Sequence, residues 1–125
     1  NSLYGMYDRD AGYSELGNAL AILCGAAEDE VARAIAEVLT NAESDLTEIT
    51  LSMKCFKYDA LLLVDETKYA PYVIEDIKRI YLGMLDAGAT SVWETEKGAA
   101  DFGGAGSLCH GWSALPVYYI RKFIK

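Results

Sequence analysis

Apolar residues recur at helical spacing along most of this chain, and no segment alternates strictly enough to predict a strand. The pattern predicts a first helix from Ser14, which can cap it, to Gly25, which can end it. A second helix follows from Asp29 to near Asn41, so the two are expected to form a tight hairpin. The expected buried faces are Leu16, Ala19, Leu20 and Leu23 in the first helix and Val31, Ile35, Val38 and Leu39 in the second.

Three further helices are predicted in the rest of the chain. Thr50 can cap the third, and a turn over Asp65–Tyr69 separates it from a fourth helix whose first turn holds Pro71. A fifth helix includes Pro116, which must lie in its first turn or kink it. Their faces are Met53, Phe56, Ala60, Leu63 and Val64, then Ile74, Ile77, Tyr81, Met84 and Leu85, and last Leu115, Tyr119 and Phe123. The prediction is an all-α fold of five helices in consecutive antiparallel hairpins.

Length and charge limit the class of protein. The 125 residues suit a single domain, and 52% hydrophobic residues predict a real core. The net charge of −8 argues against nucleic acid and anionic membrane surfaces as partners. No apolar run approaches the roughly 18 residues of a membrane span. We therefore expect one soluble domain over residues 1–125.

The number and spacing of the cysteines do not predict a set of disulfides. Cys24, Cys55 and Cys109 are an odd number without a CxxC motif, and are expected to be buried free thiols, with one disulfide and a leftover thiol as the alternative. Free thiols favour the cytoplasm, although the sequence does not fix the compartment. One histidine and scattered cysteines offer no zinc ligand set, so no metal or cofactor is predicted.

The stretch Gly88–Trp112, which reads GATSVWETEKGAADFGGAGSLCHGW, carries most of the residues that a site would need. It contains both tryptophans, the only histidine and the carboxylates Glu94, Glu96 and Asp101. A long, glycine-rich connection between packed helices is uncommon unless it is functional. We interpret it as one wall of a binding cleft.

Glu94 is the leading candidate for chemistry in this stretch. The indole of Trp93 can stack on a sugar ring and raise the pKa of the neighbouring carboxyl, whereas the alternative is a solvated loop acid. His110 can donate a hydrogen bond to a ligand hydroxyl or satisfy a loop carbonyl. Trp112 is a sugar platform or a core residue.

Polar groups around the start of the first helix give a weaker signal. Tyr13, Glu15 and Asn18 can line the same cleft or act as ordinary capping residues. Two familiar sites are disfavoured. The GGAG sequence lacks the Lys-Ser/Thr ending of a phosphate loop, and Ser107 has no nucleophile elbow around it.

Residues 84–112 resemble two motifs of glycoside hydrolase family 78, the α-L-rhamnosidases. Met84-Leu85 followed by GATSVWE is similar to that family's GATT-x-WE segment, and the SLCH of residues 107–110 is similar to its later S-x-N-H segment. The order and the spacing agree. YSELGNALAIL is also similar to a helix found upstream in these enzymes.

The resemblance implies an (α/α)6 toroid, the six-hairpin glycosidase fold, which has more helices than are predicted here. The chain is therefore expected to be the C-terminal part of a catalytic domain, a fragment whose partner is the missing N-terminal half of the barrel. The implied activity is inverting hydrolysis of terminal α-L-rhamnose-type bonds by a longer parent, with carbohydrate as substrate and no cofactor.

Site residues carry over one by one. Glu94 matches the family's general base and His110 its sugar-contacting histidine, while Trp93 and Trp112 are expected to bind substrate. Cys109 stands where the family has Asn. The family's general acid lies in an upstream acidic motif that this sequence does not contain, so the isolated chain is expected to be inactive.

Two other functions and one physical property follow from the same residues. The alternatives are a six-hairpin glycosidase of another specificity and a non-catalytic helical module that binds carbohydrate or a protein through the Trp93/Trp112 loop. The apolar run Ala60–Val64 and the row Val117, Ile120 and Ile124 are expected to be exposed by the missing helices. Pairing with a second copy is expected to cover them.

Overall fold

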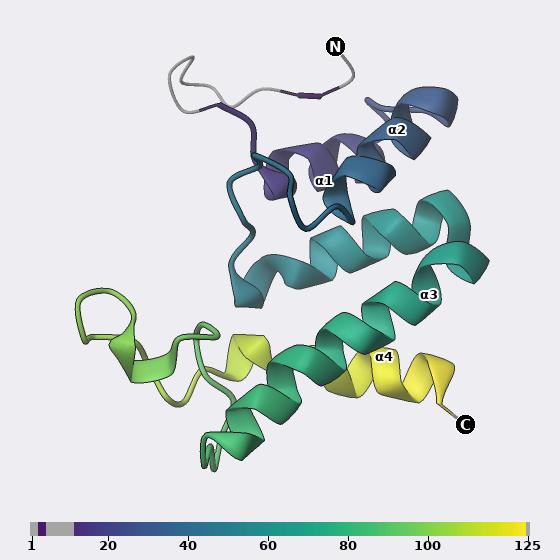
Figure 1. Cartoon of the computed structure of the whole chain (residues 1–125). Coiled ribbons are helices and arrows are strands. Elements are labelled where there is room, and N and C mark those ends of the chain that lie inside the picture. Colours follow the sequence, from purple (N-terminus) through teal and green to yellow (C-terminus); the bar gives the residue numbers. More distant parts are fainter. Residues whose placement is uncertain (1–2, 5–11, 125) are drawn as a thin grey trace. The chain divides into compact units, whose positions relative to one another are not determined.

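The computed structural model describes residues 3–4 and 12–124 (Figure 1). All regular structure within these residues is helical, and they contain no strand beyond one isolated bridge between Ser14 and Thr47. The α-helices are α1 (Glu15–Leu23), α2 (Asp29–Leu39), α3 (Lys54–Asp86) and α4 (Pro116–Phe123). Short 3₁₀ turns are η2 (Leu51–Met53), η3 (Gly98–Ala100) and η4 (Gly111–Ser113). The all-α prediction is confirmed.

The chain divides into two compact units. The first contains Asn1–Ile49 and Met53–Tyr69, and the second contains Thr50–Ser52 and Ala70–Lys125. Helix α3 therefore contributes residues to both units. The expectation of one domain over residues 1–125 stays a prediction.

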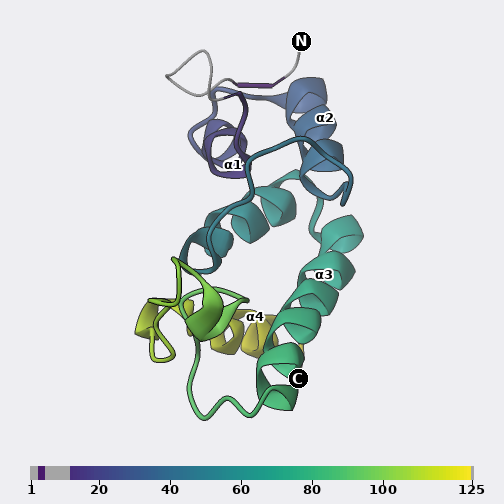
Figure 2. The ribbon, with the colours of Figure 1, turned by 60° about the vertical axis from the view of Figure 1, so that its left-hand side comes forward.

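Helices α1 and α2 contact each other in the first unit, as the predicted hairpin requires (Figures 1 and 2). Ser14 caps α1, and its Oγ accepts a hydrogen bond from the Gly17 amide at 3.1 Å. The chain leaves α1 through Gly25, whose φ of +75° is a conformation that glycine adopts without a Cβ clash. Both ends of α1 therefore lie where the sequence predicts them.

The buried face of α1 is rotated from the predicted one. Leu20 is 41% exposed, while Glu15 and Asn18 are buried. The Glu15 carboxylate accepts hydrogen bonds from the Ile49 amide at 3.0 Å and from Lys57 Nζ at 2.5 Å. These partners satisfy a buried charge, which an apolar pattern cannot anticipate.

Asn18 fills a structural role at the same helix. Its Oδ1 accepts from the Tyr4 amide at 2.8 Å, and its Nδ2 donates to the Tyr4 carbonyl at 3.1 Å. The structural interpretation of Glu15 and Asn18 is therefore favoured over the cleft interpretation. In α2 the buried residues are Ala32, Ile35, Ala36 and Leu39, and Val31 is exposed.

Helix α3 is interrupted at Asp65, whose φ of −161° and ψ of 97° are not helical. Asp65 Oδ1 accepts a hydrogen bond from the Lys68 amide at 2.9 Å, which is N-cap geometry for the segment that follows. The separation of two helical segments is thus confirmed. The predicted turn over Asp65–Tyr69 is wrong, because helix resumes directly after Asp65 and Pro71 lies inside it.

The run Ala60–Val64 in the first unit is mostly covered. Ala60 and Leu61 are fully buried, and only Leu63 is strongly exposed, at 65%. The expectation that this run forms an exposed apolar surface is therefore wrong.

The second unit contains the apolar cluster Leu51, Ile80 and Met84. Helix α4 begins with Pro116 in its first turn, as one of the two predicted options allows, and buries Tyr119. The predicted row of Val117, Ile120 and Ile124, on the side of α4 and at its C-cap, is exposed, and so is Tyr118. None of the described helices combines the length and the apolarity needed to cross a membrane.

Candidate functional site

The connection between α3 and α4 folds back on itself within the second unit (Figure 1). The His110 amide donates to the Val92 carbonyl at 2.8 Å, and the Glu94 amide donates to the Ser107 carbonyl at 2.9 Å. The Ser91 hydroxyl also donates to the Leu108 carbonyl. Residues 91–94 therefore lie alongside residues 107–110, which brings the Glu94 and His110 backbones onto neighbouring segments.

Trp93 anchors this connection. Its half-buried indole packs against the cluster of Leu51, Ile80 and Met84. A Cβ added at Gly98 would lie only 2.7 Å from the indole, and Gly98 has a φ of +56°. The close approach of backbone to indole therefore requires glycine at position 98.

Glu94 has a partly exposed carboxylate. The Ser107 amide donates a hydrogen bond to its Oε2 at 3.2 Å. No other hydrogen bond to this side chain is formed by the residues that the structure describes. Glu94 thus has one oriented oxygen, and its other oxygen can accept a proton from a water molecule or a ligand.

His110 and Trp112 lie at the start of the segment leading into α4. His110 is partly exposed and precedes η4 as its N-cap residue. Trp112, within η4, is 74% exposed. The alternative of a core tryptophan is therefore wrong, and this indole is open to a ligand.

The exposures of the three cysteines also differ from expectation. All are free, but Cys24 and Cys109 are exposed and only Cys55 is half-buried. Burial, together with the charge of Asp59, raises the pKa of the Cys55 thiol. The expectation of buried thiols is wrong for Cys24 and Cys109, because each lies just after a helix end or within the loop.

A bidentate ion pair, which the sequence does not reveal, ties the loop to α3. Arg79 donates to both oxygens of Glu96, at 2.7 and 3.1 Å, and to Asp76 at 2.9 Å. These hydrogen bonds, chiefly the one to Glu96, raise the pKa of Arg79 further above its already high value. No local pattern signals a pair that lies 17 positions apart in the sequence.

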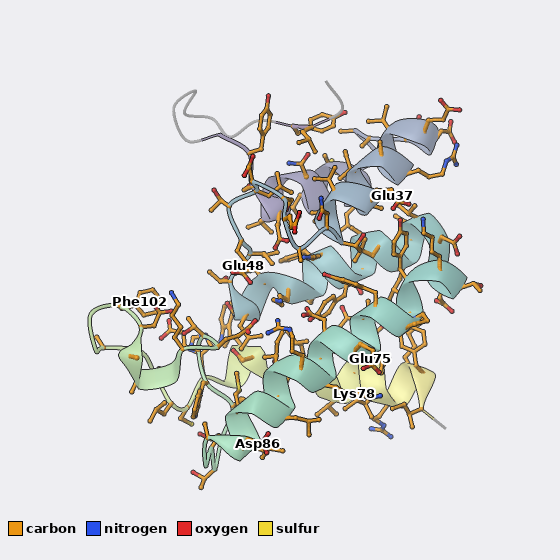
Figure 3. The ribbon with its side chains drawn as sticks, viewed as in Figure 1. Glu37, Glu48, Glu75, Lys78, Asp86 and Phe102 are labelled. Carbon is orange, nitrogen blue, oxygen red and sulfur yellow. The ribbon has the colours of Figure 1, made fainter. Side chains whose placement is uncertain are left out.

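The far end of the loop is organised by Asp101. Its carbonyl accepts from the amides of residues 104, 105 and 106, and its Oδ1 accepts from the Phe102 amide at 3.0 Å. Phe102 (Figure 3) has a φ of +50° and is 59% exposed. Asp101 therefore shapes the loop, and Glu96 and Asp76 are engaged by Arg79, whereas Glu94 is engaged by no cation among the described residues.

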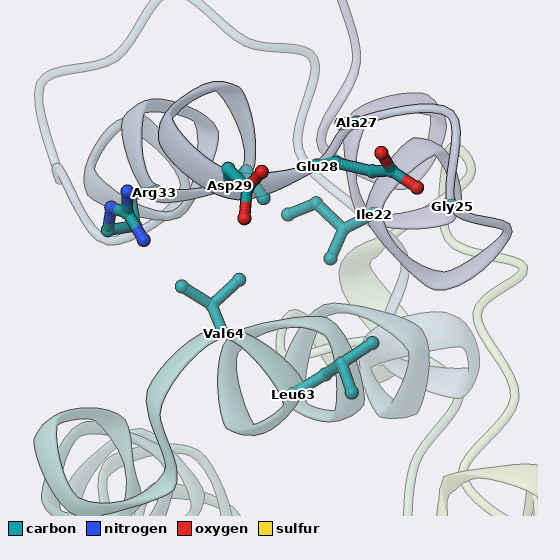
Figure 4. A pocket seen from close by; sticks show the side chains of 9 residues that line it. Ile22, Gly25, Ala27, Glu28, Asp29, Arg33, Leu63 and Val64 are labelled. Carbon is teal, nitrogen blue, oxygen red and sulfur yellow. The ribbon is translucent and has the colours of Figure 1, made fainter.

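A pocket of about 410 Å³ lies elsewhere, in the first unit (Figure 4). Its lining comes from the end of α1, the connection to α2, the start of α2 and the part of α3 just before Asp65. It comprises Ile22, Gly25, Ala27, Glu28, Asp29, Ala32, Arg33, Leu63 and Val64. None of the predicted site residues lines it. The described residues also contain no cluster of His, Cys, Asp and Glu able to hold a metal ion.

Comparison with known proteins gives one informative likeness. No protein-family model and no curated protein matches the sequence. The structure is similar to the crystal structure of a GH78 family rhamnosidase of Bacillus sp. GL1, with a TM-score of 0.72 and 30% sequence identity. The match covers 87% of this chain and 12% of that one, so the chain spans about an eighth of the rhamnosidase's length. The chain therefore has a GH78-like helical fold.

Proposed function

We propose that this chain supplies one side of a glycosidase active site, with Glu94 as the general base. The proposed reaction is the inverting hydrolysis of terminal α-L-rhamnose-type bonds by a longer protein. The observation that carries the proposal is the setting of Glu94. Its carboxylate is held by the Ser107 amide next to the anchored Trp93, in a fold similar to part of a GH78 rhamnosidase.

An inverting glycosidase needs an ionised base and a protonated acid about 6.5–9.5 Å apart, so that a water molecule fits between base and sugar. The oxygen of this water attacks the anomeric carbon, and Glu94 accepts the proton that the water loses. The bond to the leaving oxygen breaks on the opposite face, and the acid gives that oxygen a proton. We assign the acid to a part of the longer protein outside this chain, because the resemblance to family 78 implies an upstream acidic motif that this sequence does not contain.

The sugar contacts are assigned to three side chains of the same loop. The exposed indole of Trp112 and the uncovered part of the half-buried Trp93 indole offer apolar surface, which suits the C–H surfaces of a sugar ring. His110 offers a ring nitrogen for a sugar hydroxyl. The three free cysteines favour a cytoplasmic location over a secreted one, without fixing the compartment.

The test is Glu94→Gln in the longest natural protein that contains this chain, assayed on an aryl α-L-rhamnoside. Loss of the base is expected to lower kcat by at least about 100-fold. Glu48→Gln, at an exposed carboxylate of the first unit, is the matched control and should stay within about twofold. A loss below about tenfold in Glu94→Gln would refute the base assignment.

The rival binding-module function gives a different result. The 125-residue chain alone would then bind L-rhamnose as tightly as the longer protein, which tryptophan fluorescence can measure because both indoles lie in the proposed site. Half a site should instead bind at least about tenfold more weakly than the longer protein.

A further inference from the structure

We infer that the Ser107 hydroxyl is a positioning group that holds the Glu94 carboxylate in register with His110. This inference rests on the proposed function of Glu94. It concerns a residue that does not itself touch the sugar. The evidence is a closed ring of hydrogen bonds through residues 92–94 and 107–110.

Ser107 contacts Glu94 through its backbone on both sides. The Glu94 amide donates to the Ser107 carbonyl at 2.9 Å, and the Ser107 amide donates to Glu94 Oε2 at 3.2 Å. The carboxylate therefore follows any movement of residue 107. Glu94 has no other side-chain contact of this kind among the described residues.

The Ser107 side chain extends the same connection toward the histidine. Its Oγ lies 3.1 Å from the Cys109 carbonyl, to which it donates, and 3.3 Å from the Cys109 amide, from which it accepts. His110 follows directly, and its amide donates to the Val92 carbonyl at 2.8 Å. The hydroxyl therefore closes the turn between the residue that holds Glu94 and the residue proposed to hold the sugar.

The neck of the loop, where the backbones of Gly98 and Gly106 approach each other, restricts how far Ser107 can shift. Gly106 precedes it, and a Cβ at Gly106 would overlap the carbonyl oxygen of Gly98 and lie 3.0 Å from its carbonyl carbon. Gly98 in turn lies against the Trp93 indole. Backbone contacts thus fix Ser107 from one side, and its own hydroxyl fixes the turn on the other.

The first experiment uses the 125-residue chain and NMR spectroscopy. His110 is the only histidine, so its ring signals need no assignment. Glu94→Gln is introduced into three backgrounds: the native chain, Ser107→Ala and Ser107→Thr. We measure the change in NMR chemical shift that Glu94→Gln causes at the His110 ring and amide. This change should be at least about twofold smaller in the Ser107→Ala background and should return to its native size in Ser107→Thr, which keeps the hydroxyl. Ser44→Ala, in a turn of the first unit, is the control background.

Equal shift changes in all backgrounds would overturn the inference. Hydrogen exchange of the Glu94 amide reports whether the loop stays closed. Slow exchange together with a reduced shift change in Ser107→Ala would show that the loop stays closed while the coupling between Glu94 and His110 weakens. Fast exchange in Ser107→Ala that is absent from Ser107→Thr would show that the hydroxyl holds the whole junction. Fast exchange in both variants would count against the inference.

The second experiment measures activity in the longest natural protein that contains this chain. Ser107→Ala is expected to lower kcat by about 10- to 100-fold with KM within about threefold, and Ser107→Thr to restore most of it. An unchanged kcat in Ser107→Ala would refute the positioning role. Failure of the proposed function is separate, since it would appear as full activity in Glu94→Gln while the NMR result stood.

Discussion

Substituting Gly106 by alanine is the sharpest structural test of the loop. An added Cβ would overlap the carbonyl oxygen of Gly98, which is backbone and cannot rotate away as a side chain can. Either residue 106 or the Gly98 turn must move by about 1.5 Å to restore ordinary carbon–oxygen contact, because the added Cβ would lie 1.9 Å from the oxygen. Gly98 has little room to retreat, because its own α-carbon faces the Trp93 indole.

The magnitude follows from the contacts at the neck. Overpacking of a closed site typically costs about 1–3 kcal/mol. Moving residue 106 also strains the two hydrogen bonds between Glu94 and Ser107, each worth about 1 kcal/mol. The second unit should therefore lose about 3–5 kcal/mol of its free energy of unfolding, the sum of these two effects.

Urea unfolding of the chain, followed by tryptophan fluorescence, measures this loss, since both tryptophans lie in the second unit. Gly111→Ala is the matched control. It adds the same methyl group in the same loop, but nothing lies within 4 Å of its Cβ position. Its free energy of unfolding should change by less than about 0.5 kcal/mol. Equal midpoints and slopes for the two variants would refute the steric reasoning.

Three further predictions concern other parts of the chain. Lys57→Met leaves a buried carboxylate without its cation and should destabilise the first unit by about 3–5 kcal/mol. Lys78→Met, at an exposed ion pair, should cost less than about 1 kcal/mol, and urea unfolding followed by far-UV circular dichroism, which reports on the helices of both units, measures the two losses. The raised pKa of Cys55 leaves less thiolate near pH 8, so iodoacetamide should modify Cys55 more slowly than the exposed Cys24. The rate of Cys55 modification should go on rising at higher pH, and equal rates for the two cysteines in peptide mass mapping would contradict this prediction. The exposed apolar side of α4 is expected to pair two copies of the chain, so sedimentation equilibrium should show dimers at micromolar concentration that Ile120→Glu abolishes, and a 13.7 kDa monomer throughout would exclude the pairing.

Local signals predicted the helices well and their contacts poorly. Ser14 and Gly25 gave the ends of α1 correctly, because capping depends on a few neighbouring residues. The buried face of α1 was wrong, because Glu15 is satisfied by Lys57 from 42 positions away. A charged residue counts as exposed in any apolar pattern until its partner is known.

The same distinction explains the break in α3. The sequence predicts a helix start at Pro71, because proline is common in the first turn of a helix. In the structure Asp65 provides the cap, and Pro71 lies inside the helix. Both residues are compatible with a helix terminus, and the sequence does not rank them.

In the candidate site, the sequence pointed to Glu94 and to the Gly88–Trp112 stretch, and the resemblance to family 78 agrees with the GH78-like fold. It did not point to Ser107 or Arg79 as partners of the loop. Their roles depend on residues that become neighbours only when the chain folds back, across 13 and 17 positions.

The contact between Gly98 and Gly106 has a consequence for how such a loop can diverge. Backbone atoms of Gly98, Asp101 and Gly106 close the base of this loop, so residues 102–105 beyond them can change in length and composition while the base and the carboxylate beside it stay in place. Phe102, at the exposed end, lies within this replaceable part. Selection can therefore alter what residues 102–105 present to a ligand independently of the residue that would activate water, and Asp101 and Gly106 mark the ends of the segment that is free to vary.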